Sequence, residues 1–397
     1  MEKFDFTWNI DRYNTDSIKY DAAKMMGKPD GLIPLWVADM DFMTPNEVIK
    51  AMVERAEHGI FGYTDAISDR YFNAVRGWMD RHHGYFPQSE WLVMCPSVVN
   101  AICTAIRALT SEGDGVIIQQ PVYHPFAESI VSNHRKCVVN SLVYESGQYH
   151  IDFDDFESKI ISENVTLFIL CNPHNPIGRV WTREELTRLG DLCAKHHVKV
   201  VSDEIHEDFV FEDWGHKHVV FSELKPEFAD MTITCTAPSK SFNLAGLQQS
   251  NIFIPNSEMR GLFKREVTRM GLGVPNVMGF TACIAAYEKG DEWLKALKIQ
   301  LMDNILYVRT FLETHIPKVK LVETQATYLL WLDFNELGLT QPELDAFIAD
   351  EAKLWLNTGT MFGELGKGFQ RMNVACPKAT LEKAMLQLKH AIERIDA

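Results

Sequence analysis

The middle of the chain alternates short apolar runs with longer segments of helical periodicity, and this pattern constrains the fold more than any other feature. Seven runs rich in β-branched residues lie between residues 90 and 255, at 91–95, 115–119, 136–140, 165–171, 198–202, 231–236 and 251–254. Helical segments separate them. The segment 182–197 opens with Thr182 and Glu185 at the spacing of a capping box. Apolar strands that alternate with helices predict a mainly parallel sheet with helices on both faces, which is a three-layer αβα, α/β-class domain.

The two ends of the chain show different patterns. A long amphipathic helix is expected at 291–316, followed by two strands and then two helices, at 319–323, 328–333, 341–352 and 380–395. This order predicts a smaller α+β domain. The first 45 residues show little regular pattern, so we expect an arm that crosses between domains or subunits. The predicted organisation is an arm at 1–45 that belongs with the small domain, a large domain at 46–288 and a small domain at 289–397.

Charge and cysteine usage narrow the classes of function. The chain has 54 acidic and 39 basic residues and a formal net charge of -15, which disfavours nucleic acid and anionic membranes as partners. The eight cysteines form no C-x-x-C pair, so we expect no zinc or redox motif and no metal site. The N-terminus lacks the pattern of a signal peptide, and no apolar run approaches about 20 residues. We therefore expect a cytoplasmic protein.

Four of the expected strands are followed by residues that could carry chemistry. Ligands of an open α/β sheet bind at the carboxyl ends of its strands, and Ser97, Asn175, Asp203 and Lys240 follow four different runs. Each has a simpler interpretation by itself: a helix N-cap for Ser97 and Asp203, a strand-to-helix turn around Asn175, and a solvated loop for Lys240. His206 alone is more often a structural histidine than a ligand. The order of these residues along the chain is more specific than any one of them.

Two motifs contain these residues and are specific. They are Asn172-Pro-His-Asn-Pro-Ile-Gly178 and Ser239-Lys-Ser-Phe-Asn-Leu-Ala-Gly246. Through them, nearly the whole chain resembles the fold-type I pyridoxal-phosphate enzymes of the class I/II aminotransferase family. Within that family it is most similar to the MalY/PatB-type carbon–sulfur β-lyases, also called cystathionine β-lyases, by the stretches 35–42, 172–178 and 202–206. The resemblance implies a PLP-transferase-like large domain and the cofactor pyridoxal 5′-phosphate (PLP).

The resemblance also implies a role for each matching residue around the cofactor. Lys240 would bond the cofactor aldehyde and, once substrate has freed it, take the substrate's α-proton. Asp203 would pair with the pyridine nitrogen. Asn175 would donate to the 3-oxygen of the ring and lie near the substrate carboxylate. The other residues expected around the cofactor are Tyr123 stacked on the ring, His206, and the phosphate-binding set Ser97, Val98, Val99 and Ser239.

Substrate and subunit contacts follow from the same resemblance. Arg371 matches the arginine that clamps the substrate α-carboxylate, and Ala38 would contact the substrate as well. Tyr63 matches a tyrosine that reaches the phosphate of the neighbouring subunit, which implies a homodimer whose active site is completed by the second subunit. Tyr123 and Tyr63 are therefore candidate catalytic residues beside Lys240.

Two positions depart from the pattern of many aminotransferases in this family. His206 stands where they carry a tyrosine, three positions after Asp203. Gln248 stands where they carry a phosphate-binding arginine, eight positions after Lys240. The second departure leaves open how the phosphate dianion is neutralised, and the neighbours of Lys240 and Tyr63 of the partner subunit are the compensating groups that we expect.

The expected reaction is an α,β-elimination. The β-substituent of a cysteine S-conjugate such as cystathionine leaves as a thiolate, and pyruvate and ammonia are the other products. Three alternatives stay open. An aminotransferase would use the same lysine, aspartate and asparagine; a regulatory protein would bind PLP without turnover; and an α/β protein could lack the cofactor altogether.

Overall fold

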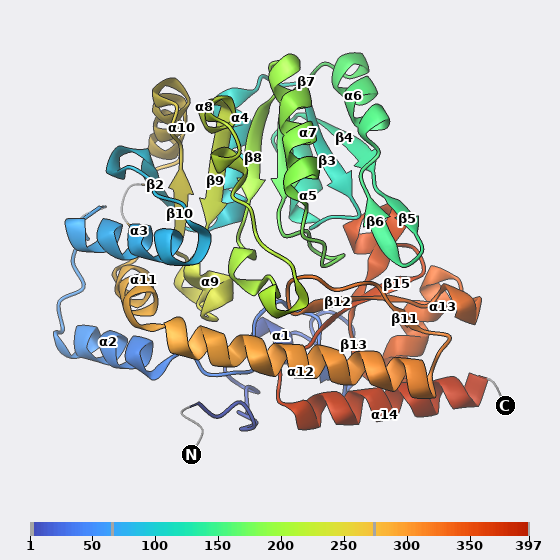
Figure 1. Ribbon diagram of the computed structural model, residues 1–397. Coiled ribbons are helices and arrows are strands. Elements are labelled where there is room, and N and C mark those ends of the chain that lie inside the picture. Colours follow the sequence, from blue (N-terminus) through green and yellow to red (C-terminus); the bar gives the residue numbers. More distant parts are fainter. Residues whose placement is uncertain (1–3, 65–66, 273–274, 396–397) are drawn as a thin grey trace.

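The computed structural model describes residues 4–64, 67–272 and 275–395 (Figure 1). A seven-stranded sheet in the order β2-β10-β9-β8-β7-β3-β4 forms its centre. Its strands are β2 Leu92–Cys95, β3 Gly115–Gln120, β4 Lys136–Ser141, β7 Val165–Cys171, β8 Lys199–Asp203, β9 Thr232–Thr236 and β10 Ser250–Phe253. Neighbouring strands pair in parallel, except that β10 is antiparallel to both β2 and β9. The predicted mainly parallel sheet is therefore confirmed.

Helices cover both faces of this sheet because its strands are apolar on both sides. The flanking helices are α4 Val98–Leu109, α5 Pro125–Ser132, α6 Phe153–Ser162, α7 Arg183–Lys195, α8 Pro226–Met231 and α10 Ser257–Arg269. Phe168 and Leu170 of β7 pack in one core with α6, α7 and α8. Leu167 and Ile169 point the opposite way and pack with α4, α5 and α10. This three-layer αβα arrangement confirms the expected fold class.

Local sequence signals fix where the helices of this layer begin. Thr182 accepts a hydrogen bond from the backbone N–H of Glu185, whose carboxylate accepts from the backbone N–H of Thr182. This is the predicted capping box of α7. Ser97 caps α4 in a similar way by accepting from the backbone N–H of Asn100.

The C-terminal third contains a second sheet and two long helices. The antiparallel sheet is built from β11 Lys320–Leu321, β12 Leu329–Asp333, β15 Phe369–Asn373 and β14 Asn357–Thr358. The long helices α12 Asp291–His315 and α14 Lys378–Ile395 run side by side beneath the large sheet in Figure 1. The expected helix at 341–352 is α13 Gln341–Ala346 followed by a π-helical turn at Phe347–Glu351.

The N-terminal arm lies against this C-terminal third. After the short helix α1 Ile18–Asp21, strand β1 Ile33–Pro34 pairs in parallel with β13 Leu354–Trp355. Trp36 stacks on Trp355 with ring centroids 4.3 Å apart. The arm thus contacts the small region, while the domain boundaries at 45 and 288 remain predictions.

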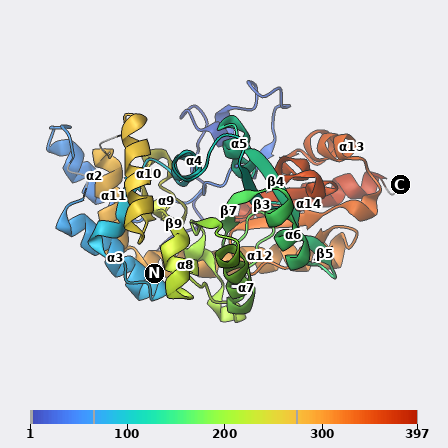
Figure 2. The same ribbon diagram turned by 90° about the horizontal axis from the view of Figure 1, so that it is seen from above.

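Helices that the sequence analysis did not single out form one end of the molecule (Figure 2). They are α2 Asn46–Glu57, α3 Asp69–His83 and α11 Val277–Lys289. A short helix, α9 Pro238–Ser241, follows β9, and a hairpin joins β5 Val143–Glu145 to β6 Gln148–His150. All eight cysteines are free. No helix among the described residues has the length and apolar character needed to cross a membrane.

Candidate active site

The strand ends of the large sheet bring the predicted residues to one cavity. Asp203 ends β8 and lies in register between Cys171 of β7 and Cys235 of β9. Helix α9, which carries Lys240, directly follows β9. A cavity of about 500 Å3 opens at this edge. Its lining includes every predicted site residue except Tyr63, namely Ala38, Ser97, Val98, Val99, Tyr123, Asn175, Asp203, His206, Ser239, Lys240 and Arg371.

Lys240 carries an amine that can lose its proton near neutral pH. Its Nζ donates a hydrogen bond to the carbonyl oxygen of Ala38 at 3.1 Å, which is a neutral acceptor. Burial, together with the nearby positive charge of Arg371, lowers the pKa of Lys240 to about 8. A lysine in this state is a competent nucleophile toward an aldehyde.

Asp203 is a buried carboxylate with little to stabilise its charge. The backbone N–H of Ile205 donates to its Oδ1 at 3.2 Å, and the side chain forms no ion pair with any described residue. Burial raises the pKa of Asp203 to about 7. A cationic N–H group placed in the cavity would supply the missing partner, and the protonated pyridine nitrogen of PLP is such a group.

Arg371, on β15, is the matching buried cation. Its guanidinium donates to three neutral oxygens: Oδ1 of Asn175 at 3.0 Å, the carbonyl oxygen of Trp36 at 3.0 Å, and Oδ1 of Asn357 at 2.7 Å. Its Nε has no hydrogen-bond partner in the described part of the chain. Burial lowers the pKa of Arg371 to about 10. A guanidinium so placed fits a ligand that brings its own carboxylate.

The N-terminus of α4 offers a site for a phosphate. The first hydrogen bond of this helix runs from the N–H of Ala101 to the oxygen of Ser97. The amides of Val98 and Val99 precede it, so they have no acceptor within the helix. These amides, the hydroxyl of Ser97 and the helix dipole together suit an anion. Ser239 adds a second hydroxyl at the cavity wall.

Two further aromatic side chains line the cavity. His206 is buried, and burial together with the charges of Lys240 and Arg371 lowers its pKa to about 3, so its imidazole is neutral. Its Nδ1 has no hydrogen-bond partner among the described residues. Burial raises the pKa of Tyr123, so its phenol keeps its proton at neutral pH.

Tyr63 and Gln248 lie outside the cavity. Tyr63 is 97% exposed. Gln248 is exposed, and its neighbour Gln249 lines the cavity in its place. Lys240 and Arg371 are the only lysine and arginine among the described residues that line the cavity. Neither is a sequence neighbour of the N-terminus of α4.

Asn243 is a positioning residue that was not predicted, although it lies in the lysine motif. Its Oδ1 accepts from the N–H of Met40 at 2.9 Å, and its Nδ2 donates to the carbonyl oxygens of Met40 and Phe42 at 3.0 Å each. Because Asn243 lies three positions after Lys240, these bonds fix the N-terminal arm to the lysine loop. The motif 239–246, which contains both Lys240 and Asn243, is the sequence feature that could have indicated this role.

Two other positioning residues had no signal in the sequence. Tyr328 donates through its hydroxyl to the carbonyl oxygen of Ala38 at 2.9 Å, so this one oxygen accepts from both Tyr328 and Lys240. Asn357 orients Arg371 from a strand of two residues, which is too short for a periodic pattern.

The chain matches known proteins over nearly its whole length. Residues 30–388 match the model of the family Aminotransferase class I and II. The chain is 45% identical over 383 residues to cystathionine beta-lyase PatB of Bacillus subtilis, covering 96% of this chain and 98% of that protein. It is 35% identical over 396 residues to protein MalY of Escherichia coli, covering 99% and 100% of the two chains. The crystal structure of cystalysin from Treponema denticola, which contains a pyridoxal 5′-phosphate cofactor, is similar with a TM-score of 0.94 at 34% identity over 99% of each chain. The predicted resemblance is confirmed, and the chain belongs to the aminotransferase class I and II family.

Proposed function

We propose that this protein is a PLP-dependent carbon–sulfur β-lyase that cleaves cystathionine or related cysteine S-conjugates. The observation that carries the proposal is one cavity holding an amine with a lowered pKa, Lys240, a buried carboxylate without a cation, Asp203, and a buried arginine without an anion, Arg371. Each unsatisfied group matches one part of the cofactor or of an amino-acid substrate. The identity to cystathionine beta-lyase PatB over nearly the full length of both chains supports the reaction class.

The residues that would hold the cofactor surround the cavity. Lys240 would bond its aldehyde carbon, Asp203 would accept from its pyridine N–H, and Asn175 would donate to its ring oxygen. Tyr123 and His206 would flank the ring, and Ser97, Val98, Val99 and Ser239 would bind the phosphate. When bound, PLP withdraws electrons from the substrate's α-carbon and so makes its proton acidic.

The chain's own residues would then place and move protons. Arg371 would bind the α-carboxylate of the substrate through its guanidinium fork. Lys240, freed by the substrate amine and with a pKa of about 8, would take the α-proton as a general base. A thiolate leaves the β-carbon without strong acid assistance. With one water, a cysteine S-conjugate yields a thiol, pyruvate and ammonia.

A second subunit would complete the site. Tyr63 is exposed, and the neighbouring Ile60 and Phe61 expose large apolar side chains as well. Exposed apolar side chains grouped on one segment are typical of a subunit interface. We therefore propose a homodimer in which Tyr63 of the partner subunit binds the phosphate, which would compensate for Gln248. The free cysteines suit a reducing compartment, so the cytoplasm remains the proposed location.

The pyruvate assay tests the proposed reaction. Purified protein is given cystathionine and a panel of cysteine S-conjugates without any 2-oxo acid, and pyruvate is followed with lactate dehydrogenase. Sustained release of pyruvate and thiol in equal amounts is expected. Turnover only after a 2-oxo acid is added would identify an aminotransferase instead. A yellow protein with no turnover of any amino acid would indicate a regulatory protein that binds PLP.

A further inference from the structure

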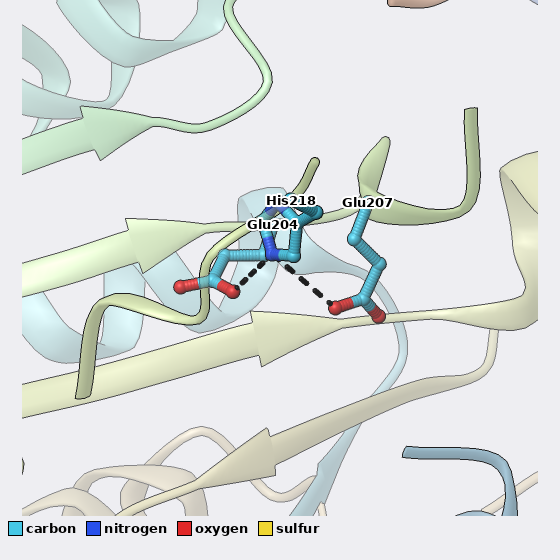
Figure 3. Close-up of side chains that lie close together, drawn as sticks. All are labelled: Glu204, Glu207 and His218. Carbon is cyan, nitrogen blue, oxygen red and sulfur yellow. Dashed lines mark hydrogen bonds and ion pairs between the residues drawn. The ribbon is translucent and has the colours of Figure 1, made fainter. Parts of the chain in front are cut away.

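The end of β8 and the segment that follows it carry polar side chains on two sides. Asp203 and His206 line the cavity that contains Lys240. Glu204 and Glu207 instead lie beside His218, which comes from a loop further along the chain (Figure 3). We call Glu204, Glu207 and His218 the carboxylate–histidine cluster. All three side chains are buried.

The polar atoms of this cluster converge. His218 Nε2 lies 2.8 Å from Oε2 of Glu204 and 3.9 Å from Oε2 of Glu207. One ligand atom from each of the three residues lies within 4.8 Å of the other two. The Nε2 atom of His83 also lies 3.9 Å from Oε2 of Glu207, but it is hydrogen-bonded to Oδ1 of Asp208 at 2.8 Å. One imidazole and two carboxylates therefore surround one small volume.

Glu207 is the member of the cluster with a buried carboxyl oxygen, Oε2, that has no hydrogen-bond partner among the described residues. It is 4% exposed, and its Oε2 accepts no hydrogen bond from any described residue. The contacts of 3.9 Å to the two imidazoles are too long for hydrogen bonds. Glu204, by contrast, accepts from the hydroxyl of Ser202 at 2.7 Å and from the N–H of Phe221 at 3.2 Å, in addition to His218. An unpaired buried carboxylate is costly, and it points at the nitrogen atoms of two histidines.

A second cavity gives access to this place. It has a volume of about 410 Å3, and its walls include His83, Glu207 and His218. Neither Lys240 nor Asp203 lines it, so an ion could reach the cluster without entering the candidate active site.

We propose that Glu204, Glu207 and His218 bind a divalent zinc-type cation. Imidazole nitrogen combined with carboxylate oxygen is a ligand set of zinc, whereas calcium and magnesium prefer oxygen alone. Ligands at about 2.0–2.2 Å from a tetrahedral zinc ion lie about 3.3–3.6 Å apart. The separations of 2.8 and 3.9 Å around His218 Nε2 bracket this value.

The ion would connect the segment that follows β8 to the loop that carries His218. It would lie at the second cavity, whereas Asp203 lines the cavity that contains Lys240. This departs from the expectation of no metal site, which rested on cysteine spacing. The ligands at 204, 207 and 218 match no familiar metal motif. The proposal does not depend on the reaction at Lys240.

Equilibrium dialysis of the holoenzyme tests the proposal. Protein treated with chelator is dialysed against a series of Zn2+ concentrations, and bound zinc is measured by mass spectrometry. One ion per chain is expected, with affinity at least about tenfold weaker in Glu207→Gln. The matched control is Glu227→Gln, an exposed glutamate of α8 that does not line the second cavity, and this variant should bind like the unmodified protein. Equal zinc binding by Glu207→Gln, or no saturable binding by the unmodified protein, would overturn the proposal.

The unmodified protein provides a second measurement in case Glu207→Gln does not fold. X-ray absorption at the zinc edge of the loaded holoenzyme should show nitrogen and oxygen neighbours with the multiple scattering of imidazole. A shell that contains sulfur would place the ion on a cysteine and contradict the assignment.

Discussion

The segment 203–208 separates two buried polar regions that differ in how their charges are satisfied. On the cavity side, Asp203 accepts one backbone hydrogen bond and Arg371 donates only to neutral oxygens. On the opposite side, Asp208 accepts from the indole N–H of Trp78 and pairs with His83 at 2.8 Å. It also bonds the hydroxyl of Ser241, the residue after Lys240.

This difference distinguishes residues that bind a ligand from residues that stabilise the fold around the cavity. Polar groups that lack partners in the empty cavity raise the free energy of the folded protein. A ligand that supplies those partners lowers this free energy again. Groups with internal partners stabilise the fold and hold the loops that carry Asp203 and Lys240. We therefore expect substitutions in the cavity to reduce activity with little change in stability, and substitutions behind it to do the reverse. Glu207 is the exception on the second side, and its lack of a partner is the basis of the zinc proposal.

Lys240→Ala should give the largest effect. It removes both the attachment of the cofactor and the general base, so pyruvate release should fall by about four orders of magnitude. In protein free of cofactor, the midpoint of thermal unfolding should change little, because Lys240 makes only one hydrogen bond to a described residue, and its acceptor is neutral. The matched control is Lys289→Ala, an exposed lysine at the end of α11. Full activity of Lys240→Ala would refute the proposed role.

Asp203→Asn should come next. A neutral amide cannot hold the positive charge of the cofactor ring, so kcat should fall about a hundredfold or more while the protein stays folded. Removing a poorly stabilised buried carboxylate should also leave the free energy of unfolding unchanged or raise it slightly. The rate of pyruvate production measures kcat, and urea unfolding measures the free energy of unfolding. A large loss of stability with normal kcat would reverse the expected contrast.

Glu204→Ala should show the opposite balance. It leaves Ser202, His218 and the N–H of Phe221 without their acceptor, which should cost about 3 kcal/mol in the free energy of unfolding. In protein free of metal, Glu207→Gln should cost less than about 1 kcal/mol, because Oε2 of Glu207 loses no hydrogen bond. Urea unfolding in the presence of chelator compares the two variants. Equal losses of stability in the two variants would show that Glu207 is as well satisfied by its neighbours as Glu204 is.

Arg371→Lys should act mainly on substrate binding. Lysine keeps the charge but loses the fork that holds a carboxylate, so KM should rise about 10- to 100-fold with a smaller change in kcat. Steady-state kinetics with cystathionine separates the two constants. An unchanged KM would exclude Arg371 from the carboxylate site.

The smallest expected effect is the pH dependence of cofactor uptake. Only the neutral form of Lys240 attacks an aldehyde, and its pKa is lowered to about 8. The rate at which protein stripped of cofactor takes up PLP should therefore rise with pH and reach half its maximum near pH 8. Arg371→Gln removes a positive neighbour that lowers this pKa, so the midpoint should move upward. A midpoint near that of a free lysine in the unmodified protein would contradict the burial of Lys240.

Much of the fold could be predicted because its signals are local. The strands of the large sheet lie within one residue of their expected bounds, for example β7 Val165–Cys171, since each is an apolar run ended by turn residues. The carboxyl-end rule for parallel sheets then placed Asp203 and Lys240 together. Helices α2 and α3 were not predicted from the sequence.

The supporting contacts could not be predicted in the same way. Tyr328 and the carbonyl oxygen of Ala38 are 290 positions apart in the chain, and nothing local to either residue indicates the contact. His218 and Glu207 are closer in the chain, but they lie in short or irregular segments, where no periodic pattern indicates their contact. Long-range pairs of single polar residues leave no periodic trace, whereas strands and capping boxes do.

The bond between Lys240 and the cofactor is the central claim, and one chemical experiment tests it directly. The purified yellow protein is reduced with borohydride, digested and analysed by mass spectrometry. A phosphopyridoxyl group on the peptide that contains Lys240, in one copy per chain, is the predicted result. The label on any other lysine, or its absence from a protein that carries PLP, would contradict the account.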